Sequence, residues 1–203
     1  MNVELHHRFD GPEGAPVLVL SNSLGTTVDM WDELVPALAE RFRLLRYDTR
    51  GHGRSPVPPG PYSIDDLGRD ALAVLDRLGL ERVSFCGVSL GGMTGMWLAA
   101  RAPERIERLA VCCSSAHMPP PEMWTERADA VRSDGMAAIA DATLGRWFTP
   151  AASERRTEAV ERLRSGLLGM APEGYAGCCE AIRDMDLRPA LGSIRAPTLV
   201  IAA

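Results

Sequence analysis

The pattern with the clearest chemical meaning is the stretch Gly87–Gly92, which reads Gly-Val-Ser-Leu-Gly-Gly. A serine in a G-x-S-x-G pattern can act as a nucleophile when the chain turns sharply there from a strand into a helix. The neighbouring glycines leave out the Cβ atoms that would collide in such a turn. The Ser89 hydroxyl would then stand at a helix N-terminus, where the dipole favours developing negative charge. Such short patterns also arise by chance, so this one depends on its surroundings.

The segments beside Ser89 are those that the turn requires. Val83–Cys86 is a short apolar run typical of a buried strand, and Met93–Ala100 is small and apolar, typical of a helix packed on a sheet. A turn of this kind leaves the backbone N–H of Leu90 free to bind an oxyanion. We therefore predict Ser89 as the catalytic nucleophile and Leu90 as an oxyanion donor.

Strand-like and helix-like segments alternate along the first half of the chain. The strand-like runs are apolar at nearly every position, as in a parallel sheet that is covered on both faces. Ser63 and Asp66 match a capping box at the start of one helix. The alternation predicts an α/β fold with a doubly wound, mostly parallel sheet. The expected strands are Val17–Leu20, Leu44–Tyr47, Val83–Cys86 and Leu109–Cys113, and the expected helices are Asp29–Glu40, Ser63–Leu78 and Met93–Ala100.

The middle of the chain has a different character. Residues 118–188 are helical and charged in pattern, without a strand-like run, so we predict a helical lid inserted after a first core part at 1–117. Residues 189–203 begin the returning core strand, with sheet character at Pro197–Ile201. This strand would lack its covering helix, so we expect the fold to be C-terminally incomplete, with apolar sheet surface exposed.

Composition excludes several classes of function. The net charge of −5 disfavours a nucleic-acid partner, and the five cysteines show no C-x-x-C spacing for a metal or redox site. No signal peptide is visible, and no apolar run approaches the ~20 residues that a membrane span needs. We expect a cytoplasmic protein with no membrane partner. The oligomeric state stays open.

Four stretches of the sequence are informative together: Ser21–Thr27, Asp29–Trp31, Tyr47–Gly53 and Gly87–Gly92. They resemble the 3-oxoadipate enol-lactonases of the β-ketoadipate pathway. The Ser89 turn and the Arg-Gly-His-Gly turn belong to the α/β-hydrolase superfamily at large, whereas Asn-Ser-Leu-Gly narrows the match. The resemblance implies an α/β-hydrolase fold and a serine hydrolase that opens 3-oxoadipate enol-lactone to 3-oxoadipate in aromatic compound catabolism. It also implies a small-molecule substrate and no need for a metal or an organic cofactor.

The same resemblance implies roles for two loops at strand ends. The loop after the first strand would supply the second oxyanion donor at Leu24, with Asn22 and Ser23 as substrate contacts; the alternative is a generic polar turn. In the charged turn after Tyr47, Asp48 and His52 invite assignment to a catalytic triad. We interpret them as structural, because this fold presents its general base elsewhere.

The acid and base of the triad would follow the strand at Leu199–Ile201, and thus lie beyond Ala203. His117 could reach the site, but no neighbouring carboxylate orients it, so we interpret it as a polar lining group. The 203 residues alone are therefore expected to hydrolyse substrate very weakly.

The substrate of such a lactonase carries a carboxylate that the lid must hold. Trp147 is the predicted lid contact, with a plain core aromatic as the alternative. Two other functions stay open, a carboxylesterase of the same fold and a non-catalytic binding protein. The sequence does not show which lid residue holds the substrate carboxylate. The candidates are Trp124, Arg127, Arg132, Arg146 and Trp147.

Overall fold

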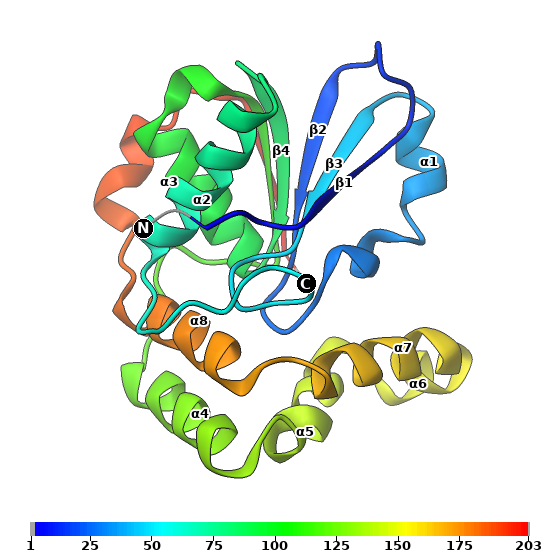
Figure 1. Ribbon diagram of the computed structural model, residues 1–203, viewed down its shortest axis with the longest axis vertical. Coiled ribbons are helices and arrows are strands. Elements are labelled where there is room, and N and C mark those ends of the chain that lie inside the picture. The colour runs from blue at the N-terminus through cyan, green and yellow to red at the C-terminus, as the bar shows by residue number, and fades with distance from the viewer. Residues whose placement is uncertain (1–2, 203) are drawn as a thin grey trace.

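The computed structural model describes residues 3–202, which form one six-stranded sheet with helices around it (Figure 1). The strand order is β1-β3-β2-β4-β5-β6, and every neighbouring pair is parallel except β1 with β3. The predicted α/β class with a mostly parallel sheet is confirmed. The strands are β1 (His7–Asp10), β2 (Val17–Ser21), β3 (Arg43–Tyr47), β4 (Val83–Val88), β5 (Ile106–Cys112) and β6 (Thr198–Ile201).

Helices cover both faces of the sheet because successive strand side chains point to opposite sides. Val19 and Leu45 pack into the larger core with helices α2 (Ile64–Arg77) and α3 (Leu90–Arg101). Leu20 and Leu44 pack on the opposite face with the short helices η1 (Val28–Trp31) and α1 (Val35–Ala39). Figure 1 shows α1 on one side of the sheet and α2 with α3 on the other.

Local sequence signals explain where these elements begin and end. The predicted capping box is confirmed, since the Ser63 hydroxyl accepts from the Asp66 N–H and the Asp66 carboxylate accepts from the Ser63 N–H. The prediction of one helix over Asp29–Glu40 is wrong, because the segment divides into η1 and α1. Pro36 has no N–H to donate to the carbonyl of Asp32, so a helix cannot run through it unbroken.

Five helices between residues 121 and 184 lie together at the carboxyl ends of the parallel strands (Figure 1). Helix α4 packs on α8, and α5 packs on α7. Within residues 118–188 the structure has no strand, only an isolated bridge between His117 and Asp186. We call this group the helical layer; it consists of α4 (Pro121–Asp134), α5 (Ala137–Trp147), α6 (Pro150–Arg155), α7 (Thr157–Leu168) and α8 (Pro172–Asp184).

The edge strand β6 follows a short 3-10 helix, η3 (Arg188–Ser193), and pairs with β5. Its three apolar side chains are exposed, with Leu199 at 59%, Val200 at 68% and Ile201 at 48% of their full accessibility. The expected exposure of apolar sheet surface at this strand is therefore confirmed. Among the described residues, no helix combines the length and apolarity needed to cross a membrane.

Candidate active site

Ser89 sits in a strained turn between β4 and α3. Its backbone has φ 52° and ψ −115°, outside the regions that non-glycine residues normally occupy. Such a conformation costs on the order of 1–3 kcal/mol and persists only where the surroundings enforce it. The surroundings are tight, because a Cβ on Gly87 would lie 2.2 Å from the Gly91 backbone, and one on Gly91 would lie 2.2 Å from the Ser21 carbonyl oxygen. The predicted need for glycines is confirmed.

Neighbouring strands hold this turn in place. The Ser89 N–H donates to the Cys112 carbonyl at 2.9 Å, and the Ser114 hydroxyl donates to the Ser89 carbonyl at 2.7 Å. Ser89 is half-buried, and no residue between 3 and 202 hydrogen-bonds to its hydroxyl. The nucleophilic atom is thus fixed through its backbone while its Oγ stays available. Sequence reasoning missed Ser114, although it follows a strand adjacent to β4.

Two backbone N–H groups lie on adjacent loops beside Ser89. Strands β2 and β4 are neighbours, and the Gly91 N–H donates to the Asn22 carbonyl at 3.0 Å, which joins their carboxyl-end loops. The N–H of Leu90 belongs to the first turn of α3, where N–H groups have no intrahelical acceptor. The N–H of Leu24 likewise has no acceptor among residues 3–202. Both amides remain available for an anion, as an oxyanion hole requires.

His52 supports the loop that carries Leu24. Its side chain is 1% exposed, Nε2 accepts a 3.0 Å hydrogen bond from the Gly25 N–H, and Nδ1 lies 3.2 Å from the Arg50 carbonyl. Burial lowers the pKa of His52 to about 4, so the ring is neutral at pH 7, with the proton on Nδ1. Both nitrogens are engaged inside the protein. The predicted structural role of His52 is confirmed.

Asp48 ties two further loop segments to the same turn. Its carboxylate accepts from the Val28 N–H at 2.8 Å and from the Arg54 N–H at 3.0 Å, and the residue is 1% exposed. It makes no contact with His52 of the kind that a catalytic pair would need. The structural interpretation of Asp48 is confirmed as well.

The family model described as alpha/beta hydrolase fold matches residues 16–203. The chain belongs to the α/β-hydrolase family. It is 43% identical to 3-oxoadipate enol-lactonase 2 of Acinetobacter baylyi over 99% of this chain and 75% of that protein. It is 38% identical to 3-oxoadipate enol-lactonase 1 of the same organism over 96% of this chain and 73% of that protein. The crystal structure of an enol-lactonase from Burkholderia xenovorans superposes with a TM-score of 0.96 at 50% identity, covering 98% of this chain and 78% of that one.

These comparisons confirm the resemblance found in the sequence. They also confirm the predicted enzyme class, a hydrolase that cleaves esters. The internal contacts of each predicted residue bear on which side chains of this α/β-hydrolase are free to touch its substrate.

Asn22 is a structural residue of this α/β-hydrolase. The residue is 1% exposed and its side chain is bonded at both ends, and its predicted contact with substrate stays a prediction. Its Nδ2 donates to the Tyr47 carbonyl at 2.8 Å, and its Oδ1 accepts from Trp31 Nε1 at 2.8 Å. Ser23 differs, since it is half-buried and its hydroxyl has no hydrogen-bond partner within residues 3–202. The predicted contact of Ser23 with substrate stays a prediction.

The described histidines make hydrogen bonds elsewhere than to the nucleophile. His117 Nδ1 lies 3.2 Å from the Met185 carbonyl, and His7 lies on the edge strand β1. With His52 engaged as above, no histidine among residues 3–202 hydrogen-bonds to Ser89. The same residues contain no cluster of His, Cys, Asp or Glu able to hold a metal ion.

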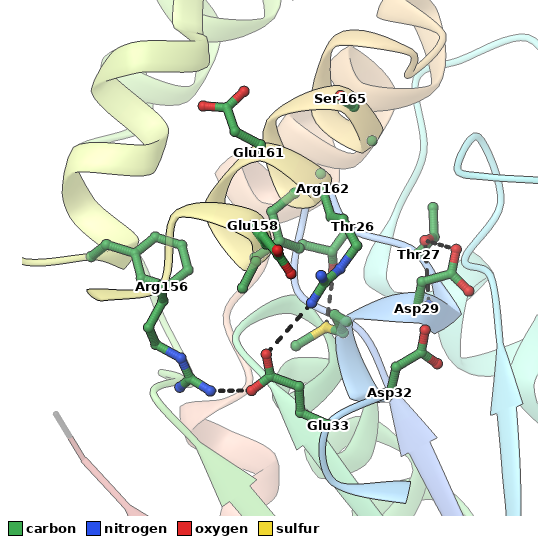
Figure 2. A pocket seen from close by; sticks show the side chains of 16 residues that line it. Thr26, Thr27, Asp29, Asp32, Glu33, Arg156, Glu158, Glu161, Arg162 and Ser165 are labelled. Atoms are coloured by element: carbon green, nitrogen blue, oxygen red, sulfur yellow. Dashed lines mark hydrogen bonds and ion pairs between the residues drawn. The ribbon is translucent and has the colours of Figure 1, made fainter. Parts of the chain in front are cut away.

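A broad cleft of about 1030 Å³ opens between the loop that follows Leu24 and helix α7 (Figure 2). In Figure 2, Glu33 from the core side extends toward Arg156 and Arg162 of the helical layer and forms ion pairs with both. Phe148 lines the cleft. Trp147, the residue predicted to contact substrate, precedes it and is half-buried at the end of α5. The role of Trp147 stays a prediction. Sequence reasoning missed Glu33, because its partners lie more than a hundred positions away.

Proposed function

We propose that this protein opens the lactone ring of 3-oxoadipate enol-lactone to give 3-oxoadipate, with Ser89 as the nucleophile. One observation carries the proposal: the available Ser89 hydroxyl lies in a strained turn beside two amides, those of Leu24 and Leu90, that have no acceptor within residues 3–202. Two relatives named 3-oxoadipate enol-lactonase, matched over nearly the whole chain, support this choice of substrate.

The chemistry follows from that arrangement. Ser89 Oγ attacks the lactone carbonyl as its proton passes to a general base, and the N–H groups of Leu24 and Leu90 hold the resulting oxyanion. Each such donor contributes on the order of 3 kcal/mol to the stability of the transition state. Collapse breaks the bond between the carbonyl carbon and the ring oxygen, which leaves as an enol after taking the proton from the base. The enol tautomerises to a ketone, so ring opening is downhill.

Water then completes the cycle. The same base removes a proton from a water molecule, which attacks the acyl-enzyme carbonyl through a second oxyanion, and Ser89 leaves with that proton as the acid product departs. No histidine within residues 3–202 hydrogen-bonds to the Ser89 hydroxyl. The family resemblance assigns the base to a histidine oriented by an aspartate.

The helical layer fits the part of a lid in this proposal. Residues 118–188 would cover the substrate between the core parts 1–117 and 189–203, with Ser23 and Trp147 as substrate contacts. The substrate is a small molecule, and the catalytic steps above need neither a metal nor an organic cofactor.

A comparison of two substrates tests the assignment. The full-length product of the gene is assayed with 3-oxoadipate enol-lactone and with a short-chain nitrophenyl ester. A kcat/KM at least 100-fold higher for the lactone supports the proposal, because it requires a site built for the lactone. A preference for the neutral ester would make the protein an esterase of the same fold, and hydrolysis of neither would leave the non-catalytic binding protein.

A further inference from the structure

The arginines of the helical layer differ in whether a carboxylate neutralises them. Nine arginines occur in residues 118–188, and six of them form ion pairs with Asp or Glu. Arg132, for example, is held by both Glu173 and Glu180. Within residues 3–202, Arg127, Arg146 and Arg155 have no carboxylate partner.

Two of these three arginines converge on the same hydroxyl. Nη2 of Arg127 donates to Thr143 Oγ1 at 2.6 Å, and Nη2 of Arg146 lies 3.5 Å from the same atom. Arg127 Nε also donates to the Tyr175 hydroxyl at 2.7 Å, and its guanidinium lies 5.5 Å from the Tyr175 ring centre and 6.0 Å from that of Trp124. Thr143 and Tyr175 are buried, so the pair is anchored to three helices, α4, α5 and α8.

Neutral hydroxyls and aromatic rings do not cancel the charge of this pair. Two guanidinium groups brought together repel each other. Arg127 is also half-buried, which adds to the cost of keeping it charged, whereas Arg146 is more exposed. Burial and then the charge of Arg127 lower the pKa of Arg146 below its usual range, although the group stays a cation at pH 7. A carboxylate between the two arginines would remove this repulsion.

The pair is also anchored close to the proposed oxyanion loop. A Cβ on Gly25 would lie 3.0 Å from Cε2 of Tyr175, the residue that Arg127 holds, and the rings of Tyr175 and His52 stack at 6.4 Å. Gly25 directly follows Leu24 in the sequence. One tyrosine therefore connects the cationic pair to the loop where the oxyanion would form.

We propose that Arg127 and Arg146 form the site that binds the carboxylate of the lactone substrate, and that this pair selects anionic lactones over neutral esters. This inference rests on the proposed function and adds the residues that bind the charged group of the substrate. Planar guanidinium groups suit it, because they bind carboxylates through two parallel hydrogen bonds. Arg132 is excluded from the role, since its donors already serve Glu173 and Glu180.

The test uses Arg146→Gln, because Arg127 also ties the helical layer together. Arg155→Gln is the matched control, since Arg155 is an exposed arginine of the same layer without a partner among residues 3–202. In the full-length gene product, Arg146→Gln should raise KM for 3-oxoadipate enol-lactone about 10- to 100-fold, the usual effect of losing a hydrogen bond to a charged group. Turnover of the short nitrophenyl ester should stay within twofold, and Arg146→Lys should recover part of the loss.

Calorimetry with adipate gives a second readout that does not depend on turnover. Adipate should bind the unaltered protein and the Arg155→Gln variant alike, and at least 10-fold more weakly to Arg146→Gln. Unchanged KM and unchanged adipate affinity in Arg146→Gln would overturn the inference while leaving the lactonase proposal intact. Conversely, if the unaltered protein opened no lactone but bound adipate through Arg146, the lactonase proposal would fall and a carboxylate site would remain.

Discussion

The backbone N–H of Gly25 donates a 3.0 Å hydrogen bond to Nε2 of the buried His52, so an imidazole fixes the loop that carries Leu24. The acceptor exists only while Nε2 lacks a proton, because a charged imidazole has donors at both nitrogens. Burial lowers the pKa of His52 to about 4, which keeps the ring neutral at the pH of most assays. The geometry of the proposed oxyanion hole therefore depends on His52 being neutral.

Stability should fall in acid because of His52. The unfolded chain binds a proton at this residue near pH 6.5 and the folded protein only near pH 4, so the unfolded state holds more protons between these values. This contribution of His52 to the free energy of unfolding amounts to about 3 kcal/mol. It is complete above pH 6.5 and is lost as the pH falls toward 4. Urea unfolding of the unaltered protein and of His52→Gln between pH 7.5 and 4.5 measures it. The stability gap between them should shrink as pH falls, and a constant gap would contradict the assignment.

The glycines around Ser89 should not tolerate a methyl group. In Gly91→Ala the new Cβ would meet the Ser21 carbonyl oxygen at 2.2 Å, so we expect loss of more than about 2 kcal/mol of stability together with most activity. Gly145→Ala is the matched control, because nothing lies within 4 Å of its Cβ position on α5. That change should stabilise the protein by about 0.5–1 kcal/mol. Equal melting temperatures for the two variants would show that the turn around Ser89 has room for a methyl group at position 91, contrary to the structure.

The ion pairs of Glu33 should govern local opening at the cleft more than global stability. Glu33 and its partners Arg156 and Arg162 are all about half exposed, and surface ion pairs contribute roughly 0–1 kcal/mol each. Glu33→Gln should therefore shift the free energy of unfolding by less than about 1 kcal/mol. Amide hydrogen exchange in α7 should nevertheless become faster, since one link between the core and the helical layer is lost.

Arg164→Gln provides the comparison for that measurement. Arg164 pairs with Asp141 and Glu161 inside the helical layer and makes no ion pair with the core residues that the structure describes. Faster exchange in α7 for both variants to the same degree would contradict a specific role for Glu33.

Local signals made the centre of the site predictable from the sequence. The turn at Ser89 is visible because its glycines and flanking apolar runs are adjacent in the chain. The structural role of His52 was also predictable in outline, from the charged turn in which it lies. The break at Pro36 was predictable in principle, since proline cannot donate the hydrogen bond that a continuous helix needs.

The remaining features depend on partners that are distant in sequence. Asn22 looked free to bind substrate, and only the fold brings the Tyr47 carbonyl to its amide from 25 positions away. The arginines of the helical layer are alike in the sequence. The fold distinguishes them, because it places Glu173 and Glu180 against Arg132 and leaves Arg146 without a carboxylate among the described residues.

The nucleophile itself can be tested by covalent labelling. The full-length gene product is treated with a fluorophosphonate, which reacts with activated serines, and the modified peptide is located by mass spectrometry. We predict one label per chain, on Ser89. The Ser89→Ala variant should take up no label, and its lactone turnover should be at most about one ten-thousandth of that of the unaltered protein. A label on another residue, or a Ser89→Ala variant that opens the lactone at the original rate, would contradict the account.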